Sequence, residues 1–87
     1  MFWVSIDDDF QQMMVSALRY ALTRNSYIVG LTIEYIECKI PLMDKKYLTI
    51  MSRDIDEENR FYHSLYADID KRWIQLKEKI DERLKEV

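Results

Sequence analysis

The side chains best suited to metal or redox chemistry are a single histidine, His63, and a single cysteine, Cys38, in 87 residues. A zinc site needs three or four such ligands, so one histidine and one cysteine are too few to form one. One cysteine cannot form an internal disulfide, which indicates a reducing compartment. Cys38 falls on an apolar stripe, and we therefore expect it to be a small core residue. We expect no metal and no other cofactor.

The carboxylates Asp54, Asp56 and Glu58 have the spacing of positions 1, 3 and 5 of an EF-hand loop. The sixth position is Asn59 in place of glycine, and the twelfth is Leu65 in place of glutamate, so the calcium cage cannot close. The chain also lacks a Gly-x-Ser-x-Gly elbow, a phosphate loop and a His-Glu-x-x-His motif. We predict that the protein is not an enzyme.

The composition is typical of one folded domain spanning residues 1–87, with 48% hydrophobic and 33% charged residues and a net charge of -3. One glycine and one proline are too few for a fold rich in tight turns, which favours helices. No uncharged run approaches the ~20 residues that a bilayer span needs. Residues 1–6 are apolar without a basic leader, so we expect no signal peptide and a cytoplasmic protein.

Apolar residues at helical spacing predict a compact all-α domain of four helices. In the last helix, for example, Trp73, Leu76 and Ile80 recur at i, i+3 and i+7. Asp44 is the expected N-cap of the third helix. The predicted helices cover about residues 8–24, 26–40, 44–60 and 69–86. Residues 61–68 are left open between a loop and a frayed helix.

The second predicted helix is the ambiguous one, because part of it also alternates like a strand and β-branched residues are frequent. Fourteen residues without a turn signal favour a helix, which Pro41 ends. Its apolar residues form two stripes on nearly opposite faces: Val29, Ile33, Ile36 and Ile40, and Ile28, Leu31, Tyr35 and Cys38. Two apolar faces indicate a central helix packed between neighbours.

Part of the chain resembles a known group of proteins. The run ALRYALTRNSYIV at residues 17–29, with MSRDI at 51–55, is similar to small uncharacterised proteins of bacteriophages and mobile elements of Gram-positive bacteria. The relatives commonly have glycine where Thr23 stands. The resemblance implies a setting in which small proteins act on host machinery, including defence complexes such as CRISPR effectors, by docking on a larger protein. It implies no catalytic or binding residues.

The leading hypothesis is a non-enzymatic protein–protein interaction module of a phage or mobile element that inhibits or modulates a host defence complex by steric occlusion. Its partner is then a host or phage protein of unknown identity. The aromatic residues exceed the needs of so small a core, and aromatic and arginine side chains commonly anchor interfaces. The candidate contact residues are Trp3, Arg19, Tyr20, Arg24, Phe61 and Tyr62.

Two alternatives remain. The first is a self-assembling module, because a second helix with two apolar faces can complete its core by dimerising. The other is a DNA-binding regulator, since a helix–turn–helix around Asn25-Ser26 has the connectivity of a DNA-reading unit. Glu34 and Glu37 on its second helix would repel phosphates, so we expect no nucleic-acid binding.

Overall fold

The computed structural model describes residues 7–24 and 26–86. Its elements are α1 (Asp8–Ala21), α2 (Ser26–Lys39), the short 3-10 helix η1 (Ile40–Leu42), α3 (Lys45–Ser64) and α4 (Lys71–Glu86). The described residues contain no strand, so the all-α prediction is confirmed, including the helix across the ambiguous second segment. No helix in this part of the chain is long and apolar enough to cross a membrane.

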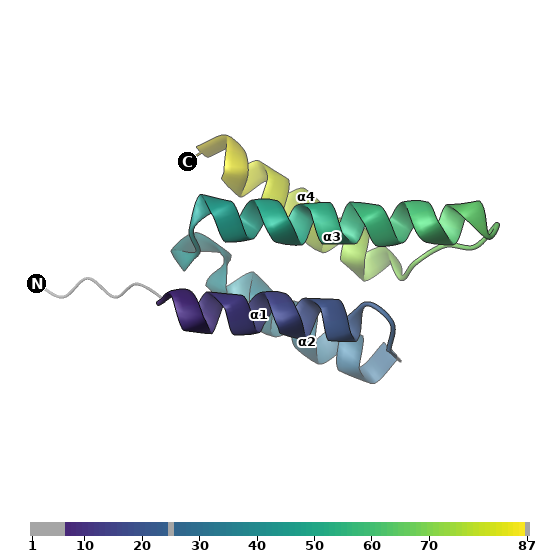
Figure 1. Ribbon diagram of the computed structural model, residues 1–87, viewed down its shortest axis with the longest axis horizontal. Helices are drawn as coiled ribbons and strands as arrows, with labels where there is room; N and C mark the ends of the chain where they lie inside the picture. Colours follow the sequence, from purple (N-terminus) through teal and green to yellow (C-terminus); the bar gives the residue numbers. More distant parts are fainter. Residues whose placement is uncertain (1–6, 25, 87) are drawn as a thin grey trace, which may run out of the picture.

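The four α-helices are arranged as two helical hairpins that pack on each other in two layers. Figure 1 shows α1 and α3 side by side in the near layer, with α2 and α4 behind them. Each helix contacts two others: α1 packs on α2 and α3, and α4 packs on α3 and α2. Short connections join α1 to α2 and α3 to α4, as expected for antiparallel neighbours, and η1 lies in the link between the two hairpins. Every helix therefore has one side in the shared core and another facing outward.

The ends of α1 are set by local hydrogen bonds. Asp7 is the N-cap, and its Oδ1 accepts the Phe10 N–H at 2.8 Å. The helix ends at Ala21, three residues before the predicted end, because the Arg24 N–H bonds the Ala21 carbonyl in a tight turn at 3.0 Å. Thr23 and Arg24 consequently lie in the connection to α2.

The uncertain stretch at residues 61–68 divides between helix and turn. α3 continues to Ser64, and a Schellman turn then stops it. In that turn the Tyr66 N–H donates to the His63 carbonyl at 3.0 Å, and the Ala67 N–H donates to the Tyr62 carbonyl at 2.9 Å. Tyr66 is in the left-handed region at φ 60°. α4 begins at Lys71, two residues later than predicted.

The core lies between the two layers and takes side chains from all four α-helices. Its largest fully buried members are Met14, Leu18, Ile36, Leu48, Met51, Ile55, Trp73, Leu76, Ile80 and Gln11. Nine of these ten are apolar, and the exception is an amide. Ile36, Trp73, Leu76 and Ile80 belong to the predicted stripes, so the helical periodicity identified the core side of α2 and α4.

The prediction for the second apolar stripe of residues 27–40 is wrong. α2 packs on α1 and α4 through Val29 and the isoleucines of its first stripe, whereas Leu31 and Tyr35 are exposed. Cys38 is exposed as well, which corrects its assignment to the core. The reason is that α2 lies at the edge of a two-layer arrangement, where no third layer covers its outer side.

Candidate interaction surface

Exposed apolar side chains cover adjacent sides of α1 and α2. We call this surface the α1–α2 face, and it consists of Met13, Ala17, Tyr20, Tyr27, Leu31 and Tyr35. Met13 is 57% exposed, Leu31 53% and Tyr27 75%. Large apolar side chains are rarely exposed together in this way unless the surface contacts something.

A shallow groove of about 240 Å³ runs along the boundary between the two helices. Met13 and Ala17 border it from α1, and Leu31 and Tyr35 border it from α2. Its floor is formed by core residues such as Met14 and Ile36. The groove thus joins Met13 and Ala17 of α1 to Leu31 and Tyr35 of α2 in one continuous surface.

The sequence of α1 gives this face a regular seam. Phe10, Met13, Ala17 and Tyr20 follow one another at steps of three, four and three residues, which is the spacing of a coiled-coil interface. Phe10 is half-buried, and its ring lies 6.2 Å from the ring of Tyr35. This contact ties the start of α1 to the end of α2 and holds the seam in place.

Charges of opposite sign flank the two ends of the seam. The Arg24 guanidinium lies 4.3 Å above the Tyr20 ring, at the C-terminal end of α1. Asp9 is exposed in the first turn of α1, at the other end. Within residues 7–24 and 26–86, neither Asp9 nor Arg24 belongs to an ion pair. Neither charge is neutralised by an ion pair in this part of the chain, although the Arg24 guanidinium stacks on the Tyr20 ring.

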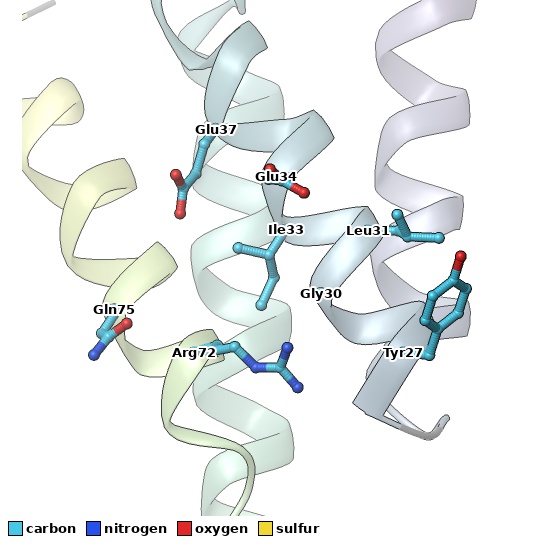
Figure 2. Close-up of a pocket in the computed structure, with 8 residues that line it drawn as sticks. All are labelled: Tyr27, Gly30, Leu31, Ile33, Glu34, Glu37, Arg72 and Gln75. Atoms are coloured by element: carbon cyan, nitrogen blue, oxygen red, sulfur yellow. The ribbon is translucent and has the colours of Figure 1, made fainter.

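A second groove, of about 610 Å³, lies between α2 and α4 (Figure 2). In Figure 2 the Arg72 side chain extends from α4 toward Gly30 on α2, while Leu31 and Tyr27 lie on the α1 side of α2. Arg72 can approach so closely because Gly30 has no side chain: a Cβ there would be 2.8 Å from Arg72 Nη1.

The charges around this second groove are largely paired within the chain. Arg72 donates to Asp70 through Nη2 at 2.7 Å and through Nε at 3.0 Å. These hydrogen bonds hold the pKa of Asp70 below its ordinary value. Across the groove, Lys79 Nζ lies 3.1 Å from a carboxylate oxygen of Glu37. The Lys79–Glu37 ion pair therefore joins α4 to α2, while the Arg72–Asp70 bonds lie at the start of α4.

The contact residues predicted from the sequence lie on different parts of the molecule. Tyr20 belongs to the α1–α2 face, and Arg24 stacks on its ring. Arg19 points to the other side of α1, where its Nε donates to Asp54 Oδ2 on α3 at 2.7 Å. Trp3 lies outside the described residues.

Phe61 and Tyr62 lie at the far end of α3. Their ring centroids are 6.1 Å apart in an edge-on contact. Phe61 is exposed, whereas Tyr62 is half-buried and packs against the core. Phe61 forms a second exposed apolar group with Leu65 and the fully exposed Tyr66, which we call the α3–α4 tip.

Sequence reasoning identified Tyr20 and missed the other five residues of the α1–α2 face: Met13, Ala17, Tyr27, Leu31 and Tyr35. Leu31 and Tyr35 were assigned to a buried stripe, and Met13 to no stripe. The regular spacing of Met13, Ala17 and Tyr20 is a signal that could have revealed the seam, because it forms a second apolar stripe beside the core-facing one.

Within the described ranges, no three histidine, cysteine, aspartate or glutamate side chains lie close enough together to hold a metal ion. Glu34 is exposed on the outer side of α2, the helix that would read DNA in a helix–turn–helix arrangement. Comparison of the chain with known protein families, with curated proteins and with solved structures finds no match.

Proposed function

We propose that the protein is a non-enzymatic protein–protein interaction module and that the α1–α2 face is its contact surface. The observation that carries this proposal is the continuity of the face, in which Met13 and Ala17 of α1 border the same groove as Leu31 and Tyr35 of α2. Single exposed apolar residues are common on proteins, but a contiguous patch on two helices is typical of a binding site.

The residue types of the face also fit this role. Tyrosine combines a large apolar ring with a hydroxyl that can bond at the edge of an interface, and tyrosine is enriched among residues that dominate binding energy. Met13 is flexible and polarisable, so it adapts to the shape of a partner. The occupant expected from this chemistry is an apolar protein surface that contains aromatic or aliphatic side chains.

The resemblance to small phage and mobile-element proteins supports a finer proposal. In that setting the module modulates a host defence complex by occupying a surface that the complex needs. An interaction face on a rigid bundle suits steric occlusion, because binding requires no chemistry from the inhibitor. This step rests on the resemblance and on analogy with proteins of that setting.

Site-specific photocrosslinking in the cells that express the gene tests the proposal. A benzophenone side chain replaces Leu31 in one variant and Met13 in another, and the matched control carries it at the exposed Thr49 on α3. We expect crosslinked products from both face positions and none from position 49. Absence of any product from both face positions would overturn the proposal, provided that circular dichroism shows the variants to be folded.

A further inference from the structure

We propose that the occupant of the α1–α2 face is a second copy of this chain, packed so that the two α1 helices run antiparallel about a twofold axis. This inference rests on the proposed interaction module and takes a second copy, in place of a host complex, as the occupant of the face. An interface of this kind is isologous: each contact between one residue and another occurs twice, once in each direction. The surface of α1 must therefore be complementary to itself when it is reversed.

The spacing of the seam meets this requirement. In the antiparallel register whose twofold axis passes between Ser16 and Ala17, Met13 of each copy lies opposite Tyr20 of the other, because the two positions are equally distant from this axis. The small side chains at this axis allow the two helices to approach closely. Sulfur–aromatic contacts between Met13 and Tyr20 would then form on both sides of the axis.

The charges at the ends of the seam fit the same register. Asp9 lies four residues before Met13, and Arg24 lies four residues after Tyr20. The reversal that places Met13 opposite Tyr20 consequently places Asp9 of each copy near Arg24 of the other. Both side chains lack an ion-pair partner in the described part of their own chain. In a parallel arrangement Asp9 would instead face Asp9 and Arg24 would face Arg24, and these like charges would repel each other.

α2 extends the contact beyond the two seams. Leu31 and Tyr35 stand beside Met13 and Ala17 along the shared groove, so the partner's α1 meets side chains of both helices. The two α1–α2 hairpins would then form a four-helix interface with the apolar face inside. The exposed parts of the large apolar side chains amount to on the order of 600 Å² per copy.

This area determines the expected strength of the dimer. A standard interface buries about 800 Å² per partner, so the α1–α2 face lies toward the low end of specific interfaces. We therefore expect a reversible dimer that dissociates on dilution through the micromolar range, rather than an obligate one. The monomer already has its own core, which is consistent with this behaviour.

Sedimentation equilibrium of the purified full chain between about 1 and 200 µM measures the association directly. We expect a monomer–dimer equilibrium for the natural chain. Met13→Glu introduces a charge into the seam and should raise the dissociation constant at least about tenfold. The matched control is Thr49→Glu on the exposed side of α3, which should leave the dissociation constant unchanged.

Charge reversal tests the register. Asp9→Lys and Arg24→Glu each replace an attractive pair by a repulsive one on both sides of the axis, so each should weaken the dimer about three- to tenfold. The double variant Asp9→Lys/Arg24→Glu restores opposite charges and should recover most of the lost affinity. Asp8→Lys is the control for the changed charge in the first turn, because Asp8 is directed toward Lys46 of α3, 3.9 Å away.

The outcomes separate this inference from the proposed function. A strict monomer at all concentrations, or a dimer that Met13→Glu does not weaken, would overturn the second copy as occupant. The same holds if the double charge reversal fails to restore association. If the protein sediments as a monomer but forms a photocrosslinked product larger than twice the chain mass, the face binds a different protein. The interaction module would then stand, and only the second copy as its partner would be wrong.

Discussion

Gln11 on α1 hydrogen-bonds Asp44, the N-cap residue of α3, although the two positions are 33 residues apart in the sequence. The Gln11 side-chain oxygen accepts the Asp44 N–H at 2.8 Å, and its Nε2 lies 3.3 Å from Asp44 Oδ2. Gln11 is fully buried. Asp44 is the N-cap residue of α3, as predicted, yet its carboxylate makes no capping bond to its own helix. The amide of Gln11 thus positions the start of α3 from a neighbouring helix.

Replacing Gln11 with leucine should destabilise the fold by about 1–3 kcal/mol, because the Asp44 N–H would lose its acceptor in a partly buried place. Urea denaturation followed by circular dichroism measures this change. The control is Gln12→Leu: Gln12 is exposed, and its amide has only a 3.4 Å contact with the Tyr47 hydroxyl. Equal losses from the two substitutions would contradict the role assigned to Gln11.

Gly30→Ala should change stability only slightly, although alanine is favoured over glycine in a helix by about 1 kcal/mol. The added methyl group would displace the Arg72 guanidinium, whose Nη1 is 2.8 Å from the ideal Cβ position. In an Arg72→Ala background that conflict is absent, and the same substitution should show its full gain. A double-mutant cycle of unfolding free energies measures the difference. Equal gains in both backgrounds would show that Arg72 does not restrict position 30.

Tyr66→Gly should stabilise the protein by about 1 kcal/mol, since a tyrosine at φ 60° pays a steric cost that glycine avoids. Tyr66 is fully exposed, so its removal costs no packing within the monomer. Leu65→Gly is the matched comparison, because Leu65 has φ -100° and gains no relief from glycine. Thermal unfolding should therefore occur at a higher temperature for Tyr66→Gly and at a lower one for Leu65→Gly.

Asp81 should contribute a pH-dependent part of the stability. Burial raises the pKa of Asp81, but hydrogen bonds from Lys77 and Ser52, at 2.8 and 2.6 Å, outweigh burial and hold the pKa below its ordinary 3.8. The folded state thus binds fewer protons than the unfolded state. The contribution is complete well above pH 3.8 and is lost as the pH falls through the lowered pKa.

The substitution Asp81→Asn should therefore lower stability at neutral pH and reduce its fall in acid. Because the Asp81 and Lys77 side chains are 40% and 27% exposed, solvent screening limits the effect of the pair to about 0.5 kcal/mol. Urea midpoints between about pH 6 and 2 give the comparison. Glu82→Gln, at an exposed position of the same helix, should keep the natural pH profile. A profile of Asp81→Asn that parallels the natural one would refute the assignment.

The helices were predictable because apolar periodicity is a local property of the sequence. Trp73, Leu76 and Ile80 form one stripe, and the fold buries all three. Helix ends were less certain, since they depend on single hydrogen bonds such as the one from the Arg72 N–H to Asp70 Oδ1, which starts α4. Periodicity cannot detect a bond of that kind.

The interaction face was harder to predict because periodicity shows which residues share a side of a helix, not whether another helix covers that side. Leu31 and Tyr35 have the same apolar character as Ile33 and Ile36, and only the tertiary arrangement separates them. Gln11 presents the opposite case. Its amide is polar, but a bond to a distant backbone group allows it to be buried.

The long outer part of α3 and the turn after it contain no buried side chain between Ile55 and Ile69. Apart from Tyr62, which packs against the core, substitutions within this stretch, and deletions or insertions in the turn after Ser64, therefore escape the volume constraints that close packing imposes elsewhere. Over evolutionary time the α3–α4 tip can change in length and chemistry while the bundle is preserved. The same freedom makes it the natural place for an engineered loop or epitope.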